Sequence, residues 1–160
     1  MKRKIVVELL ENHEKVNFYT IRFVDEKISE FEKFYDKFDI EEFETDIDTI
    51  VYWIDKIGEI GALDRYFRPE GGKLKALPID TSKLRLYCYK LTEGIVIIGN
   101  GGVKKTRTYN EDPLLNSFAS VLKTIGTFLV SRINTNKVSV HNNTLYQNLI
   151  FSIEILHEKK

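Results

Sequence analysis

Alternating apolar and polar positions at the start of the chain predict two strands, over residues 3–10 and 16–24. Beyond them, apolar side chains recur at steps of three and four. This spacing predicts a helix over about 28–38, capped by Asp25, and a second helix over about 40–57. The pattern therefore favours a strand pair followed by a helical hairpin.

The middle of the chain has the pattern expected at the centre of a sheet. Residues 73–79 predict an edge strand, because the proline near its end cannot donate to a central ladder. In 83–92 an apolar set of side chains alternates with a polar and aromatic set that includes Arg85, Tyr87 and Tyr89. We expect helices to cover the apolar face, while the other face meets solvent or a ligand. Residues 95–98 are uniformly apolar, which predicts a central strand buried on both faces, reached by a tight turn at 93–94.

A glycine-rich stretch at 99–102 separates that strand from a basic segment at 104–107. Its three glycines allow a bulge, a left-handed backbone or close approach by a ligand. The spacing fits neither a Walker-type loop nor a GxGxxG loop. The Asp-Pro pair at 112–113 predicts the start of a third helix. Strands over 137–140 and 149–156 are expected to form a second small sheet or to extend the first.

Length and composition are those of one globular domain. The 160 residues, 42% of them hydrophobic, lead us to expect a single α+β domain over 1–160. The expected fold is an antiparallel sheet packed against two N-terminal helices and one later helix, with extra terminal strands. Cys88 is the single cysteine of the sequence, so an internal disulfide is excluded. We expect its side chain to be a small buried apolar group rather than a nucleophile. We expect no signal peptide and no membrane span, and hence a cytoplasmic location.

The net charge of zero is the sum of two opposed halves. Residues 25–64 carry fourteen acidic and four basic side chains, a net of −10, whereas 65–110 carry ten basic and three acidic ones, a net of +7. Such asymmetry can give one face an attractive field for a polyanion, unless the acidic helices and basic strands neutralise each other in the fold. The acidic pairs at 41–42 and 46–48 are interpreted as solvated helix surface, because no histidine accompanies them.

A particular order of motifs runs through the basic half of the chain. It consists of Arg85-Leu86-Tyr87-Cys88, the apolar strand 95–98, Gly101-Gly102, Lys104-Lys105-Thr106 and a helix starting at Pro113. Together with the two preceding helices, this order resembles the RelE/ParE superfamily of bacterial toxins, in particular its phage-derived HigB-like branch. The resemblance covers about residues 25–133.

That resemblance implies a toxin of a type II toxin-antitoxin pair, neutralised by an antitoxin protein. RelE and HigB members of the superfamily cleave mRNA in the ribosomal A site, and ParE members inhibit gyrase. For this chain the first activity implies an endoribonuclease with mRNA and the ribosome as partners, and with no cofactor or metal. Cleavage by attack of the 2′-OH needs a base, an acid and cations that hold the charge growing on the phosphate.

The candidate site residues come mainly from the basic segments. Cations are expected to stabilise the phosphate, and tyrosines to donate a proton or to stack on unpaired bases. The catalytic candidates are Arg85, Lys104, Lys105, Arg107 and Tyr109. The RNA-binding candidates are Arg65, Arg68, Tyr87, Tyr89 and Lys90.

Three features leave other functions open. The chain is neutral, where ribosome-directed nucleases tend to be basic. The strand-rich terminal arms, 1–24 and 136–160, have no counterpart in the family pattern; they could block the sheet, bind the antitoxin, form a homodimer or direct the protein to a different target. No histidine base is predicted, because His13, His141 and His157 all lie outside the matched segment. The alternative function is a non-catalytic module of the same fold that binds nucleic acid or a protein.

Overall fold

The computed structural model describes residues 1–78, 82–105 and 112–155. Its helices are α1 (Glu30–Phe38), α2 (Glu44–Ile60) and α3 (Pro113–Asn134), with short 3-10 turns η1 (Glu41–Phe43) and η2 (Asp64–Tyr66). Its strands are β1 (Lys2–Asn12), β2 (Asn17–Phe23), β3 (Arg68–Pro69), β4 (Leu74–Leu77), β5 (Leu84–Thr92), β6 (Ile95–Val103), β7 (Ser139–His141), β8 (Thr144–Tyr146) and β9 (Ile150–Glu154).

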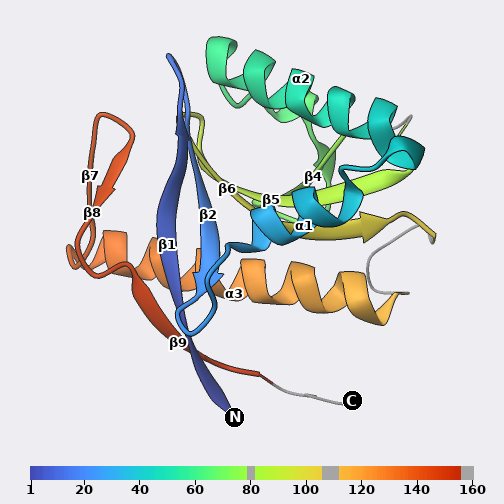
Figure 1. Cartoon of the computed structure of the whole chain (residues 1–160). Helices are drawn as coiled ribbons and strands as arrows, with labels where there is room; N and C mark the ends of the chain where they lie inside the picture. The colour runs from blue at the N-terminus through green and yellow to red at the C-terminus, as the bar shows by residue number, and fades with distance from the viewer. Residues whose placement is uncertain (79–81, 106–111, 156–160) are drawn as a thin grey trace.

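Seven of these strands form one sheet in the order β3-β4-β5-β6-β2-β1-β9. Neighbouring strands are antiparallel except β2 and β6, which are parallel. Helices α1 and α2 lie on one face of the sheet and α3 lies on the other (Figure 1). The expected α+β fold is therefore confirmed, as three layers with an apolar core on each side of the sheet.

Strand β6 occupies the centre of the sheet, as its uniformly apolar start predicts. Residues Ile95, Val96, Ile97 and Ile98 are all fully buried. Val96 and Ile98 pack in the core under α1 and α2, whereas Ile95 and Ile97 pack in the core under α3. Because successive side chains of a strand point to opposite faces, an unbroken apolar run is the pattern that two covered faces require.

The second face of β5 differs from the expectation that it meets solvent or a ligand. Helix α3 covers it, so that Tyr87 is fully buried and Tyr89 is 6% exposed. A Cβ on Gly126 of α3 would lie 2.3 Å from the Tyr89 ring, so the helix backbone rests directly on that ring. The apolar stripe of α3 is visible in the sequence, but the face of the sheet that it covers is not.

The glycine-rich stretch at 99–102 also differs from the expected break, because β6 continues through it to Val103. The register with β5 shifts between the pairs Leu86↔Gly101 and Cys88↔Ile98, so the glycines accommodate a bulge rather than a left-handed turn. A Cβ on Gly101 would lie 1.9 Å from the Arg85 carbonyl oxygen. At that position glycine allows close approach by β5 itself.

Both terminal arms belong largely to the main sheet. Strand β2 pairs with the central β6, and β9 pairs with β1, so the two ends of the chain meet along one edge. The hairpin β7-β8 makes the separate two-stranded sheet. Of the strands expected near the end of the chain, β9 therefore extends the main sheet, while β7 pairs in a second small sheet with β8, a strand that was not expected.

Two local expectations are corrected. Asp25 does not cap α1; Ser29 does, because its hydroxyl accepts from the Glu32 backbone N–H at 3.1 Å while Glu32 Oε1 accepts from the Ser29 N–H at 3.0 Å. Strand β4 is not the edge of the sheet, since β3 pairs outside it. Ile79, the last residue of the strand expected over 73–79, lies outside the described residues.

Helix α3 begins as predicted, with Asp112 Oδ1 accepting from the backbone N–H groups of Leu114 at 3.0 Å and Leu115 at 3.1 Å. This helix is also long and apolar enough to pass a test for a membrane span that uses length and composition only, a test that core helices pass as well. In the fold its apolar stripe packs on the sheet, where Leu122 and Leu129 are fully buried. This is the packing of a core helix.

Candidate functional site

The basic segment after β6 lies beside the start of β5. The Lys104 backbone N–H donates to the Lys83 carbonyl at 2.8 Å, which fixes where the segment leaves the sheet. Lys105 is exposed and Lys104 is half-buried. The remaining catalytic candidates of this segment, Arg107 and Tyr109, lie outside the described residues. The structure therefore places two of the expected cations at one end of the β5–β6 hairpin.

Arg85 and Tyr87 contact each other on the face of β5 that α3 covers. The Arg85 residue is only 2% exposed, and it pairs with Gly102 in the register of the sheet. Burial raises the pKa of Tyr87 to about 12, the neighbouring Arg85 guanidinium opposes that rise, and the nearby charges of Glu70 and Asp112 add to it. The Tyr87 hydroxyl therefore stays protonated at neutral pH.

An ion pair at the end of β3, between Arg68 and Glu70, lies next to these two residues. Arg68 Nε donates to Glu70 Oε2 at 2.9 Å, and the Glu70 side chain is only 4% exposed. Because the Glu70 and Asp112 charges both act on Tyr87, the end of β3 and the first turn of α3 lie close to the Arg85–Tyr87 contact. The fold thus brings together three residues that the sequence names as candidates, Arg68 on β3 and Arg85 and Tyr87 on β5.

The other RNA-binding candidates lie elsewhere. Lys90 is five residues after Arg85 on β5, so the two are roughly 17 Å apart along the strand. Its Nζ donates to Asp64 Oδ1 at 2.8 Å, and that hydrogen bond lowers the pKa of Asp64 together with the charges of Lys75 and Lys90. Arg65 is exposed, with its guanidinium 5.1 Å from the Tyr66 ring centroid. Tyr89 is buried under α3, so neither face of its ring is open to a base.

The acidic pair at 46–48 has two separate environments. Asp46 is buried, and its Oδ1 accepts from Ser82 Oγ at 2.6 Å and from the Lys83 backbone N–H at 2.9 Å. Asp48 is exposed on the outer side of α2. Asp46 therefore fastens α2 to the start of β5, and only Asp48 fits the interpretation of solvated helix surface.

A cavity lined by both charged and apolar side chains lies between α1, β1–β2 and α3. Its charged groups are paired with one another. Arg3 contacts Glu26 at 3.1 Å, Lys33 contacts Glu30 at 2.7 Å, and Asn100 Nδ2 donates to Glu30 Oε1 at 3.1 Å. The cluster ties the bulge of β6 to the first turn of α1, which is a structural role.

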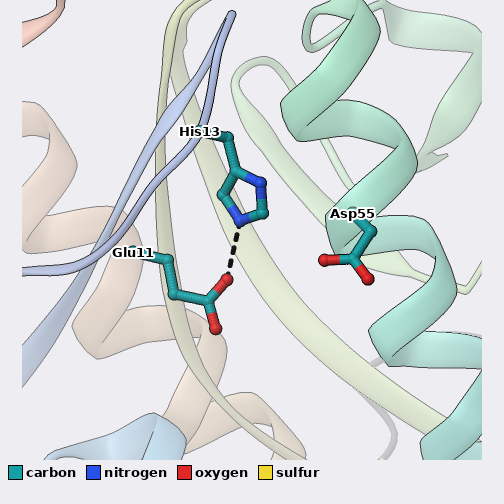
Figure 2. Close-up of side chains that lie close together, drawn as sticks. All are labelled: Glu11, His13 and Asp55. Carbon is teal, nitrogen blue, oxygen red and sulfur yellow. Dashed lines mark hydrogen bonds and ion pairs between the residues drawn. The ribbon is translucent and has the colours of Figure 1, made fainter.

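One group of chemically reactive side chains was not predicted from the sequence. Glu11 of β1, His13 of the β1–β2 link and Asp55 of α2 bring one ligand atom each to within 4.8 Å of the others. His13 Nε2 and Glu11 Oε1 are 2.7 Å apart, and Figure 2 shows Asp55 facing them from the helix. In the described part of the chain this is the one such convergence of His, Cys, Asp or Glu. No spacing rule signals it, because Asp55 is far from the hairpin in sequence.

No family model, curated protein or solved structure matches this chain.

Proposed function

We propose that this chain is a RelE/ParE-like toxin, a cytoplasmic endoribonuclease that cuts mRNA on the ribosome and is neutralised by an antitoxin. The observation that carries the proposal is the Arg85–Tyr87 contact at the end of the β5–β6 hairpin from which Lys104 and Lys105 emerge. The two helices on one face of the sheet and the later helix on the other agree with the order of elements on which the resemblance rests.

Each side chain of the cluster has a role that its environment suits. The Arg85 guanidinium holds the charge that grows on the phosphate oxygens during attack by the 2′-OH. Tyr87 serves as proton donor to the leaving oxygen rather than as base, because its raised pKa keeps the hydroxyl protonated at neutral pH. Lys104 and Lys105 hold the flanking phosphates. No side chain of the cluster is assigned as general base, so the proton of the attacking 2′-OH passes to water.

Arg85 and Tyr87 are both buried, and Tyr87 packs in the core under α3, so contact between this cluster and RNA requires α3 to move at its start. Leu115, in that turn, lies 3.1 Å from where a Cβ of Gly102 would be, so the helix sits directly on the end of β6. Docking on the ribosome would supply the free energy for that displacement, and antitoxin binding would oppose it. The toxin is therefore expected to be inactive on free RNA.

The test is mRNA cleavage on programmed ribosomes by the purified full chain. Tyr87→Phe keeps the ring and removes the proton donor, so we expect a loss of about 100-fold or more in cleavage rate. Lys105→Ala should lower the rate by weakening RNA binding, whereas Lys27→Ala, an exposed cation on the acidic half, should leave it unchanged. Intact mRNA after incubation with the wild type would refute the nuclease proposal.

A second function, non-catalytic binding of nucleic acid, is favoured by the burial of Tyr87 and Tyr89 under α3. If α3 stays in place, exposed cations such as Arg65 and Lys105 can still bind phosphate groups of a nucleic acid, whereas Arg85 and Tyr87 cannot reach it. Affinity for single-stranded RNA should then fall steeply with salt, with a smaller slope in Lys105→Ala, and without any cleavage. A salt-independent affinity would count against this function.

A further inference from the structure

We propose that Glu11, His13 and Asp55 bind a divalent first-row transition-metal ion such as Zn²⁺, which clamps the β1–β2 hairpin to the C-terminal half of α2. Two carboxylates and one imidazole from three separate segments converge there (Figure 2). The site lies outside the Arg85–Tyr87 cluster and does not depend on the proposed nuclease activity.

A β-bulge places Glu11 on the correct side of the sheet. Before the bulge Leu9 pairs with Tyr19, and after it Glu11 pairs with Phe18, so Leu10 is the extra residue. Tyr19 belongs to the core under α3, but Phe18 belongs to the core under α1 and α2. Since directly opposed residues of a strand pair point to the same face, the bulge turns Glu11 toward α2.

The imidazole of His13 is held by packing. A Cβ on Gly58 would lie 2.4 Å from His13 Cγ, so the ring occupies the space that a side chain at position 58 would fill. Its edge meets the Phe18 ring at a centroid distance of 5.4 Å. The Lys15 backbone N–H also donates to the Gly58 carbonyl at 2.8 Å, which joins the hairpin to the helix. A metal ligand fixed in this way loses little conformational entropy when it binds.

Asp55 lies one helical turn before Gly58, on the same side of α2. The carboxylate therefore projects beside the ring that packs on Gly58, as Figure 2 shows. Both carboxylates are exposed, so they can rotate toward an ion while His13 stays in place. The surrounding segment, residues 25–64, carries fourteen acidic and four basic side chains, and its field favours a cation.

The distances are close to those of a bound ion. Ligand atoms about 2.1 Å from one tetrahedral or octahedral ion lie roughly 3.0–3.4 Å from each other. His13 Nε2 and Glu11 Oε1 are 2.7 Å apart, and the three ligand atoms lie within 4.8 Å of one another. Small side-chain rotations therefore suffice to complete the site. An imidazole with two carboxylates suits Zn²⁺, Mn²⁺, Co²⁺ or Ni²⁺ better than Mg²⁺ or Ca²⁺, which prefer oxygen ligands alone.

The test is titration of the chelator-treated full chain with ZnCl2, followed by calorimetry and thermal unfolding. The wild type should bind one ion, and its Tm should rise by roughly 5–10 °C at a hundredfold excess over Kd. Glu11→Gln and Asp55→Asn keep the side-chain shapes and should each weaken binding at least tenfold. Glu59→Gln, an exposed carboxylate on the same helix, and His141→Gln, an exposed histidine on β7, should bind as the wild type does.

Loss of the imidazole is tested by His13→Gln, with its metal-free Tm measured first because His13 also packs on Gly58. A folded His13→Gln variant should lose the Tm rise with Zn²⁺, and the visible absorption of bound Co²⁺ should change in Asp55→Asn. Equal Zn²⁺ affinity in Asp55→Asn, Glu11→Gln and the wild type would overturn the proposal. So would a Tm that ZnCl2 leaves unchanged, or an equal rise with MgCl2.

Discussion

The His13 ring packs directly on Gly58 of α2, with only 2.4 Å between His13 Cγ and the position of a Cβ on residue 58. This contact, together with the hydrogen bond from Lys15 N–H to the Gly58 carbonyl, fixes the β1–β2 hairpin on the helix. Glycine is normally unfavourable in a helix by about 1 kcal/mol relative to alanine. Its presence at position 58 is therefore explained by packing.

Gly58→Ala is expected to destabilise the protein although alanine is the better helix former. The added methyl overlaps His13 Cβ and Cγ, which cannot move without displacing the hairpin. Overpacking of this kind costs about 1–3 kcal/mol, which exceeds the gain in helix propensity. Urea unfolding should show a net loss of up to about 2 kcal/mol in the free energy of unfolding.

The matched control is the same substitution in a His13→Ala background. With the ring gone, Gly58→Ala should be neutral or stabilising, and a double-mutant cycle should give a coupling energy of about 1–3 kcal/mol. Additive effects of the two substitutions would contradict the contact.

Asp46→Ala is expected to destabilise the protein by about 2–3 kcal/mol, because it leaves the Ser82 hydroxyl and the Lys83 backbone N–H without their acceptor. Asp48→Ala, two residues along the same helix but exposed, should change the free energy of unfolding by no more than about 0.5 kcal/mol. Chemical denaturation of both variants measures the difference. Equal effects would mean that Asp46 does not anchor α2 to β5.

Alkaline pH is expected to destabilise the fold through Tyr87. Burial raises its pKa from 10.0 to about 12 in the folded chain, so between these values the unfolded chain releases a proton that the folded chain retains. The stabilisation is therefore complete below pH 10 and is lost as pH rises toward 12. Tyr87→Phe should flatten this part of the stability profile, as measured by urea unfolding between pH 9 and pH 11.

The pKa values of Tyr19 and Tyr89 are also raised, in each case first by burial. The profile of Tyr87→Phe should therefore keep a residual slope in the same direction. Absorbance of tyrosinate in the folded chain should show a late-titrating fraction that shrinks in this variant. A profile identical to that of the wild type would show that the hydroxyl of Tyr87 does not stay protonated in the fold.

Cys88 should be inert toward thiol reagents in the native protein. It is fully buried on the α1–α2 side of β5, and burial raises the pKa of its thiol. Ellman's reagent should label it only as fast as the protein unfolds, and immediately in 6 M guanidinium. Rapid labelling of the folded chain would show that the core around β5 opens readily.

Several elements could be predicted because their signal is local. The apolar run 95–98 identifies a strand covered on both faces, and Asp112 with Pro113 marks the start of α3. Cys88 is buried as its apolar neighbours predict. In each case the pattern lies in the same residues that form the element. Periodicity and capping preferences over a short stretch of chain are therefore enough to predict the strand or helix.

The candidate site could be predicted only in part from such local patterns. The sequence names Arg68, Arg85 and Tyr87, but it does not show that α3 covers Tyr87, because the stripe of that helix fits either face of a sheet. Nor does it indicate the group formed by Glu11 and Asp55. One extra residue in β1 reverses the face on which Glu11 lies, and a strand pattern read without its partner does not reveal the bulge.

The sequence by itself therefore determined the strands around the β5–β6 turn, the helical stripes and the separation of acidic and basic segments. The tertiary structure alone decided the parallel pairing of β2 with β6, the cover that α3 provides over Tyr87, and the convergence of His13 with Asp55. The reason is physical. Side-chain periodicity is set by backbone geometry over a few residues, whereas strand pairing and the choice of face depend on which distant surfaces bury the most apolar area together.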